Sequence, residues 1–285
     1  MLAFAAFCRL AIVAALLAAD SDDIRPASAT ATTQPAAKPV HLAGRDWTPR
    51  EIDLSRPLAG YDACFVLLDP QKGEIVRYNA TRCAERFGPC STFKVPNTLI
   101  GLETGVLSGP DHLLKWDGTN RNRPELNHDH NLRSAIKDSV LWYFQIVAER
   151  IGPARMQAWL DRIDYGNRDI SSGQTTFWLG ESLKISALEQ AEFMCKLQRG
   201  DLPFAPRTLD LTRELIVYST ENGATLRGKT GTYGKQENTF GWFVGYVTHG
   251  EQVFPFAMNI SADKNASGPR TRELCIEILK SQGWY

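Results

Sequence analysis

The stretch Pro89-Cys90-Ser91-Thr92-Phe93-Lys94 places a hydroxyl and an amine three residues apart at the start of an apolar run. The run ends at Gly105, and its pattern predicts a buried helix with Ser91 in the first turn. Ser91 and Lys94 are expected to share one face of that helix. Unpaired N–H groups of a first turn stabilise negative charge, and burial favours a neutral lysine. We therefore interpret the stretch as a nucleophile beside a base.

The S-x-x-K spacing is weak on its own, because Ser134 and Ser261 also precede a lysine by three residues. For those two, a helix cap or a solvated lysine is the simpler explanation. The context of Ser91 differs, since the chain has a single Lys-Thr-Gly triplet, Lys229-Thr230-Gly231, in a stretch that predicts a strand. S-x-x-K at a helix start followed by K-T-G on a strand is typical of serine β-lactamases and penicillin-binding proteins.

Length and composition are those of a globular protein. The chain has 285 residues, of which 43% are hydrophobic and 22% charged, enough for one large domain or two modest ones. The 32 basic and 32 acidic side chains give a net charge of zero. Such a chain has no general attraction to nucleic acid or to an anionic membrane, so we expect neither as a partner. The sequence predicts nothing about oligomeric state.

The first 19 residues are almost wholly apolar, yet the run is too short for a membrane-spanning helix. Ala27-Ser28-Ala29 offers a cleavage site, which predicts an export signal over residues 1–29 and a periplasmic protein without stable membrane insertion. Because no positive charge precedes the apolar run, a cut nearer Ala19 or a misassigned start are alternatives. Residues 30–45 are expected to form a linker and residues 46–285 the folded domain.

Two of the six cysteines flank a predicted β-hairpin. Cys64 opens one strand, Cys83 follows the next, and residues 70–73 form the turn between the strands. The hairpin should therefore bring the two thiols close together. Oxidation after export would join them in a disulfide bond, whereas two separate buried thiols are the alternative.

The middle of the chain is mainly helical, with apolar residues at helical spacing over 141–151 and 156–163 and a capping box over 186–189. Strands are predicted over 226–233, 239–248 and 252–261, and Gly268-Pro269 opens a last helix. Strands at both ends with helices between them do not alternate as β-α-β units. We therefore expect an α+β fold, a mostly antiparallel sheet flanked by helices with an inserted helical lobe.

The polar loop over residues 116–130 contains His128 and His130, which could be taken for a metal site. No third histidine or carboxylate arrives at ligand spacing, and a hydrated loop explains the composition as well. We therefore expect no metal.

Over nearly all of residues 60–285 the sequence resembles the class D (OXA-type) serine β-lactamases. Four stretches in the family's order carry the resemblance: Ser91-Thr92-Phe93-Lys94, Ser139-Val140-Leu141-Trp142, Tyr165-Gly166-Asn167 and Lys229-Thr230-Gly231. A fifth, Phe177-Trp178-Leu179-Gly180, resembles the family's loop that covers the active-site lysine. The resemblance implies hydrolysis of the β-lactam ring of penicillin-type antibiotics, and thus antibiotic resistance.

The resemblance also implies how the base works. In this family the lysine combines with CO₂ to form a carbamate, so Lys94 would be carboxylated and no metal or other cofactor would be needed. A carbamate requires a neutral amine in an apolar pocket, and Val140, Trp178 and Leu179 match the positions that provide it. The carbamate would take the proton of Ser91 and later activate the water that hydrolyses the acyl-enzyme.

The remaining site residues implied by the resemblance handle the substrate. Ser139 would relay a proton to the leaving nitrogen while Lys229 keeps the local field positive. The N–H groups of Ser91 and Thr232 match the oxyanion donors. The substrate carboxylate would meet Thr230, beside Gly231 on the strand, and an arginine near the last helix, for which we favour Arg270 over Arg272.

Two other functions share this serine chemistry. An antibiotic-sensing domain acylates without turnover, but such domains normally follow transmembrane segments, and none is predicted after residue 19. A penicillin-binding peptidase would not explain the loop at Trp178. Hydrolysis is therefore the function that we expect.

Overall fold

The computed structural model describes residues 39–42, 44–235 and 237–285, and the predicted export signal lies outside them. Strand β1 (Val40–Leu42) and the start of β2 (Arg45–Glu51) lie within residues 30–45, where we expected a linker. These strands are held by the core, because Leu42 and Trp47 are both buried and Trp47 Nε1 donates to the Leu42 carbonyl at 2.8 Å. A linker therefore cannot extend past Val40.

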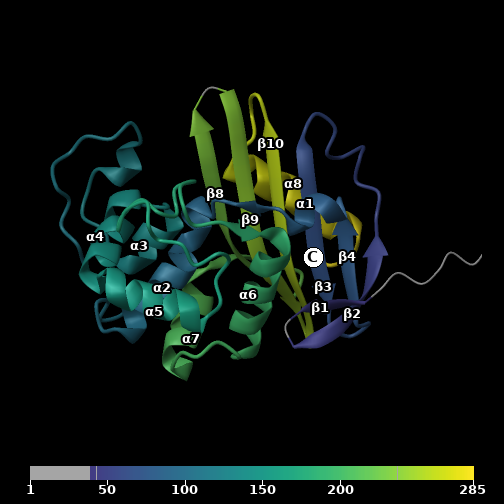
Figure 1. Ribbon diagram of the computed structural model, residues 1–285, viewed down its shortest axis with the longest axis horizontal. Coiled ribbons are helices and arrows are strands. Elements are labelled where there is room, and N and C mark those ends of the chain that lie inside the picture. The colour runs from purple at the N-terminus through teal and green to yellow at the C-terminus, as the bar shows by residue number, and fades with distance from the viewer. Residues whose placement is uncertain (1–38, 43, 236) are drawn as a thin grey trace, which may run out of the picture. The chain divides into compact units, whose positions relative to one another are not determined.

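Eight strands form one sheet in the order β1-β2-β4-β3-β10-β9-β8-β7 (Figure 1). All neighbouring pairs are antiparallel except β2 and β4. The hairpin expected from the cysteine-flanked segment is confirmed as β3 and β4. The remaining strands are β3 (Asp62–Asp69), β4 (Glu74–Tyr78), β7 (Val217–Glu221), β8 (Ala224–Lys235), β9 (Glu237–His249) and β10 (Gln252–Ala262).

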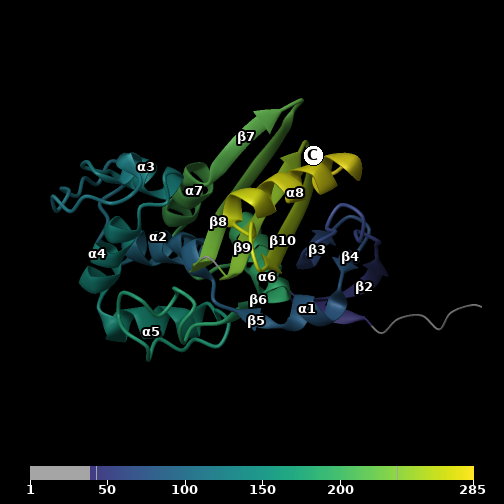
Figure 2. The same ribbon diagram turned by 90° about the horizontal axis from the view of Figure 1, so that it is seen from above.

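Helices cover both faces of the sheet (Figure 2), with α6 (Ala187–Arg199) on one face and α8 (Gly268–Ser281) on the other. Side chains along a strand point alternately to the two faces. In β3, Cys64, Val66 and Leu68 accordingly belong to the core beneath α6, whereas Phe65 and Leu67 belong to the core beneath α8. The capping box expected at Ser186 is present at the start of α6.

A helical lobe is inserted between β4 and β7 and joins the core on the α6 side (Figure 1). This arrangement confirms the predicted α+β fold. Its longer elements are α2 (Lys94–Glu103), α3 (Leu132–Lys137), α4 (Leu141–Ile151), α5 (Pro153–Arg162) and α7 (Pro206–Leu215). Its shorter elements, and those that join it to the sheet, are α1 (Ala80–Ala84), β5 (Arg86–Phe87), η1 (Cys90–Phe93), η2 (Pro124–Leu126) and β6 (Ile185–Ser186).

The hairpin brings the two cysteine thiols together but the disulfide bond is absent. All five cysteines that the structure describes are free and buried. A hydrogen bond with Cys64 raises the pKa of the Cys83 thiol, as does its burial, so the two groups are adjacent. Cys83 Sγ also donates to the Phe65 carbonyl at 3.4 Å. The expected disulfide bond is therefore wrong, and the alternative of two buried free thiols is the one that the structure shows.

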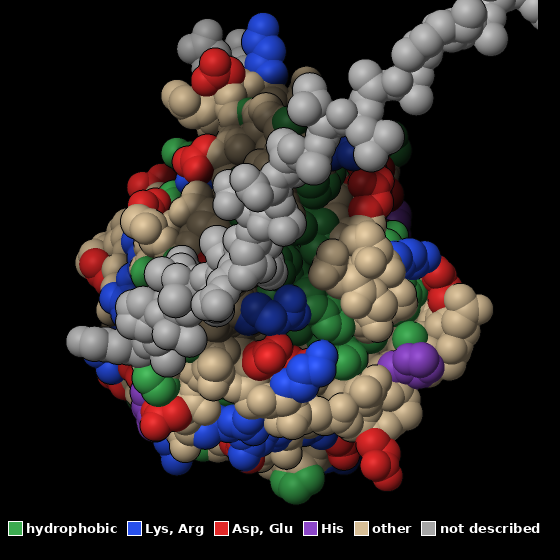
Figure 3. All heavy atoms as spheres, turned by 90° about the vertical axis from the view of Figure 1, so that its right-hand side faces the viewer, with side chains coloured by type: hydrophobic (Ala, Val, Ile, Leu, Met, Phe, Trp, Pro, Cys, Tyr) green, Lys and Arg blue, Asp and Glu red, His purple; other side chains and the backbone are tan. Residues whose placement is uncertain are grey.

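The surface carries charges of both signs. Figure 3 shows acidic and basic side chains interspersed on the side of the molecule nearest β2 and β4. Two cross-strand ion pairs there join Arg50 to Glu74 at 3.0 Å and Arg77 to Glu51 at 2.5 Å. Within the described part of the chain, no helix combines the length and the apolar character that crossing a bilayer requires.

Candidate active site

The predicted nucleophile and base lie in contact. Ser91 belongs to the 3₁₀ turn η1 and Lys94 is the first residue of α2, so the serine precedes the α-helix rather than sitting inside it. Lys94 Nζ lies 2.8 Å from Ser91 Oγ. Ser91 is half-buried, whereas Lys94 is 1% exposed. A substrate can thus approach the hydroxyl while the amine stays covered.

The surroundings of Lys94 favour its neutral form. Burial, followed by repulsion from Lys229, lowers the pKa of Lys94 well below its ordinary value. The amine lies 5.5 Å from the centre of the Phe144 ring. Val140 is completely buried in the same core, and Leu179 packs against that core. The lysine that is predicted to accept a proton is therefore buried beside the Phe144 ring.

Trp178 packs on Phe93, the residue before Lys94, and carries an unsatisfied donor. Its ring stacks on Phe93 at 5.4 Å, and its backbone carbonyl accepts a hydrogen bond from the N–H of Cys90 at 2.8 Å. The loop is thereby attached to the residue that precedes Ser91. Trp178 Nε1 is buried and has no hydrogen-bond partner among the described residues. A buried N–H of this kind costs free energy unless an acceptor occupies the pocket.

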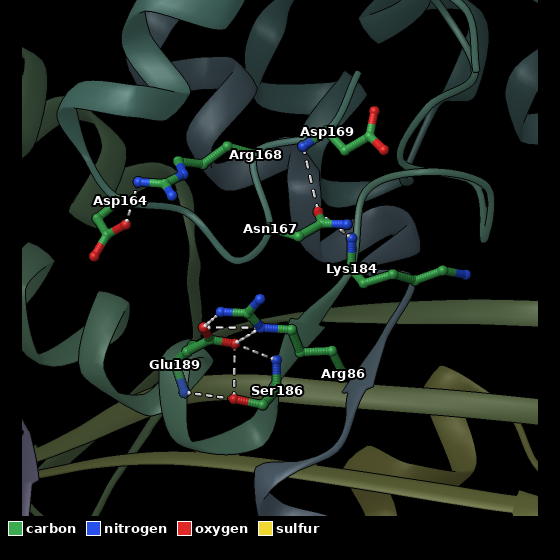
Figure 4. A network of polar contacts seen from close by, with 8 residues as sticks. All are labelled: Arg86, Asp164, Asn167, Arg168, Asp169, Lys184, Ser186 and Glu189. Carbon is green, nitrogen blue, oxygen red and sulfur yellow. Dashed lines mark hydrogen bonds and ion pairs between the residues drawn. The ribbon is translucent and has the colours of Figure 1, made fainter. Parts of the chain in front are cut away.

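The Tyr165-Gly166-Asn167 motif holds the base of the loop that carries Trp178, and Figure 4 shows its Asn167 side chain against the backbone of Lys184. Asn167 Oδ1 accepts from the N–H of Lys184 at 2.9 Å, and Asn167 Nδ2 donates to the Ser182 carbonyl at 2.8 Å. Gly166 has φ +58°, and an added Cβ would lie 2.1 Å from the Lys184 carbonyl. Only glycine fits this close approach. The motif is thus a clamp on the base of the loop.

A second serine–lysine pair lies opposite the first. Lys229 on β8 donates to Ser139 Oγ at 3.0 Å. Burial, then the charges of Arg123 and Arg272, lower the pKa of Lys229 to about 7. Residues from three segments, namely Ser91 with Lys94, Ser139 and Lys229, thus form two serine–lysine contacts.

Of Arg270 and Arg272, only Arg272 lines the cleft beside Lys229. Lys229, Thr230 and Arg272 line a cleft of about 470 Å³. Arg270 lies elsewhere: its Nε donates to Tyr61 and its Nη1 to Glu273. Arg272, with its guanidinium carbon 4.7 Å from the Tyr218 ring centre, is therefore the arginine beside Lys229, and which of the two binds the substrate carboxylate stays a prediction. The two residues leave the first turn of α8 in different directions.

Strand β8 lies against the turn that carries the nucleophile. A Cβ added to Gly231 would lie 2.8 Å from the Pro89 carbonyl, so the strand approaches η1 as closely as backbone allows. Thr232 Oγ1 accepts a hydrogen bond from the N–H of Gly268 at 2.9 Å, which ties this end of β8 to α8. Close approach of β8 to Ser91 is the condition for the predicted oxyanion donors.

The other predicted alternatives have structural explanations. Ser134 Oγ lies 2.9 Å from His130 Nδ1, and Ser261 Oγ accepts from Arg82 at 2.7 Å, so neither serine contacts the lysine three residues on. His130 is buried, and its Nε2 lies 3.0 Å from the Glu125 carbonyl. Among the described residues, no three His, Cys, Asp or Glu side chains are grouped to hold a metal ion.

One charged residue near the site has no motif in the sequence. Arg123, in the polar loop, lowers the pKa of both Lys229 and Lys94 through its charge and therefore faces the site. It carries no motif, and nothing in the spacing of the loop distinguishes it from Arg121.

Comparison with known proteins agrees with this geometry. The family model described as the penicillin binding protein transpeptidase domain matches residues 63–280. The probable beta-lactamase YbxI of Bacillus subtilis (strain 168) is 38% identical over 222 residues, which are 78% of this chain and 81% of that protein.

Two solved structures are similar throughout the folded region. The class D beta-lactamase BAT-2 has a TM-score of 0.78 and 40% identity, covering 82% of this chain and 97% of that one. The C-terminal domain of the Bacillus licheniformis BlaR penicillin-receptor has a TM-score of 0.81 and 34% identity, covering 83% and 97%. The chain therefore belongs to the class D serine β-lactamases, within the larger family of penicillin-binding transpeptidase domains.

Proposed function

We propose that the protein hydrolyses the β-lactam ring of penicillin-type antibiotics through an acyl-enzyme on Ser91. The observation that carries this proposal is the 2.8 Å contact between a half-buried hydroxyl and a lysine amine that burial keeps neutral. A serine hydroxyl becomes a competent nucleophile when such a base removes its proton.

Acylation uses both serine–lysine pairs. Ser91 Oγ attacks the lactam carbonyl and gives its proton to the base at Lys94, while the N–H groups of Ser91 and Thr232 stabilise the oxyanion. The bond between the carbonyl carbon and the ring nitrogen then breaks. Ser139, held at 3.0 Å by Lys229, passes a proton to that nitrogen. The substrate carboxylate binds in the cleft at Thr230 and Arg272.

The pocket of Lys94 also suits a carboxylated lysine. The amine is neutral, as carbamate formation requires, and the unpartnered Trp178 Nε1 provides a buried donor for a new oxygen. Carboxylation by CO₂ would supply an anionic general base that serves both acylation and the activation of water for deacylation. Val140, Trp178 and Leu179 would exclude bulk water from it.

A second function is binding without turnover, because one structural relative is named a penicillin receptor. Steady-state hydrolysis of a chromogenic cephalosporin separates the two. Sustained multiple turnovers support hydrolysis, whereas a single burst equal to the enzyme concentration contradicts it.

Export to the periplasm, signalled by residues 1–29, is part of the same proposal, since β-lactams act on cell-wall synthesis outside the cytoplasmic membrane. The mass of the mature protein recovered from the periplasm identifies the cleavage site. A full-length mass would contradict signal removal.

A further inference from the structure

Ser139 occupies a strained position at the end of α3. Asp138 is the C-cap of this helix, and the N–H of Val140 bonds to the Ala135 carbonyl at 2.9 Å. This bond is the long one of a Schellman motif, which places Ser139 at the position that glycine usually fills. Ser139 has φ +58°. A residue with a Cβ holds such a conformation only when its surroundings enforce it.

The hydroxyl of Ser139 is aimed by this turn. Lys229 Nζ lies 3.0 Å from Ser139 Oγ, so a change in the turn would move the serine away from its partner. The carbonyl of Asp138, immediately before Ser139, is one of the last carbonyls of the helix and has no partner within it. Arg123 Nη2 donates to that carbonyl at 3.1 Å.

A second nitrogen of the Arg123 guanidinium also has a partner. Its Nε donates to Glu125 Oε1 at 2.8 Å, within the short helix η2. The guanidinium therefore bridges the polar loop and the C-terminus of α3. A cation at a helix C-terminus is also favourable to the helix dipole. The contact depends on the planar fork of arginine, because two different nitrogens serve the two acceptors.

We propose that Arg123 is a positioning residue for proton transfer through Ser139, because its guanidinium holds the Asp138 carbonyl and with it the strained turn that aims the Ser139 hydroxyl at Lys229. The inference rests on the proposed function, since it requires Ser139 to act on the leaving nitrogen. It adds a residue of the polar loop to the acylation machinery. Arg123 touches neither the substrate nor the reacting atoms in this account.

The charge of Arg123 has a second effect at the same place. The Arg123 charge lowers the pKa of Lys229, after burial and ahead of Arg272, and Lys94 on α2 is a further titratable amine near Lys229. Loss of the Arg123 charge therefore raises the pKa of Lys229. The cleft that Lys229 lines contains four more charged groups, namely Arg133, Lys137, Asp138 and Glu214.

The test measures acylation alone, as the rate at which the intact protein gains the mass of a penicillin. Arg123→Met removes both the donor and the charge, and we expect acylation to slow by roughly 10- to 100-fold, the effect of a misplaced catalytic group. Deacylation should stay near the wild-type rate. The alkaline limb of the acylation rate should move to higher pH, since Lys229 then loses its proton later.

Arg123→Lys separates geometry from charge. It keeps the positive charge, so the alkaline limb should stay in place, while a single amino group restores only part of the rate. Arg121→Met is the matched control, because Arg121 lies in the same loop and pairs with Asp117 rather than with Asp138. Thermal unfolding of each variant confirms that the protein is folded.

Two results would overturn the inference. The first is that Arg123→Met acylates at the wild-type rate and the alkaline limb of its pH profile does not move. The second is that Arg121→Met slows acylation as much as Arg123→Met does, which would mean general disorder of the loop. A single burst from the wild-type protein contradicts hydrolysis but not this inference, because the acylation rate is still measured within the burst.

Discussion

The molecule has two serine–lysine pairs near each other, and they differ in what surrounds the lysine. Lys94 contacts Ser91 at 2.8 Å inside an aromatic pocket, whereas Lys229 contacts Ser139 at 3.0 Å on the wall of a cleft. Burial lowers the pKa of both. Lys229 has the charges of Arg123 and Arg272 beside it, and Lys94 has the Phe144 ring.

The difference shows how one pair of residue types performs two tasks. Burial favours the neutral form of the covered amine at Lys94 and keeps water from it, which suits a general base. The amine at Lys229 has a pKa of about 7 and lies among cations beside a cleft, which suits the proposed roles of stabilising an anionic substrate and supplying a proton through Ser139. Substitutions that disrupt one pair at a time therefore separate the two tasks.

The largest effect is expected at the nucleophile. Ser91→Ala should abolish acylation, because no other serine contacts the neutral Lys94 in the described residues. Ser139→Ala should slow acylation by about 10²- to 10⁴-fold, as for the loss of one acid–base group, without abolishing it. Intact mass after exposure to a penicillin measures both.

Ser134→Ala and Ser261→Ala are the controls for this experiment, because each has the same spacing to a lysine without the contact. Both should acylate normally. A covalent adduct on the Ser91→Ala protein would show that the wrong serine has been assigned.

Trp178→Ala tests the cover over Lys94 and should act mainly on the second step. Deacylation should slow by roughly 10²- to 10⁴-fold, because the base becomes wetter and less ordered, while acylation slows less. Trp159→Ala is the matched control, since Trp159 lies on α5 outside the site and stacks on Phe204 with the ring centres 4.6 Å apart. Equal deacylation by wild type and Trp178→Ala would remove the tryptophan from the account.

A smaller effect separates the two arginines of α8. Arg272→Met should lower kcat/KM for substrates with a carboxylate, since a hydrogen bond to a charged group contributes about 1.5–3 kcal/mol. Arg270→Met loses only its contacts with Tyr61 and Glu273 and should leave kcat/KM nearly unchanged. The reverse order would restore Arg270 as the carboxylate anchor.

The smallest effect concerns stability. Lys229 has a pKa of about 7 when folded and 10.5 ordinarily, so between these values the unfolded chain binds more protons. The free energy of unfolding should therefore rise with pH across this window, by at most about 1.4 kcal/mol per pH unit for this lysine. Lys229→Met should flatten the rise, as denaturant unfolding at several pH values would show. If Lys229→Met left the pH dependence of the free energy of unfolding unchanged, burial would not be lowering the pKa of Lys229.

Much of the site could be predicted from sequence because each pair is tied to a regular element. The Ser91 stretch opens a helix with clear apolar periodicity, and Lys229 lies on a strand with a distinctive triplet. The α+β fold followed from the same patterns. The edge strand β7 was missed because most of its residues are exposed and show no alternation.

What the sequence leaves open depends on direction in three dimensions. Arg270 and Arg272 are two residues apart, so the rotation of α8 about its axis determines which one faces the cleft, and spacing cannot show it. Arg123 acts through a carbonyl in another segment, and a polar loop has no period from which such a contact can be inferred. For Cys64 and Cys83, the hairpin predicts proximity but not oxidation.

The central claim is that the covered amine of Lys94 is carboxylated and acts as the base. The most direct measurement is to remove CO₂ from the wild-type enzyme at acid pH and then add ¹³C-bicarbonate at neutral pH. The account predicts that activity is lost and then recovers together with a carbamate carbon resonance, which Lys94→Met lacks and Trp178→Ala shows weakly. Activity that is indifferent to bicarbonate, with no such resonance, would contradict the claim and leave Lys94 as a plain amine base.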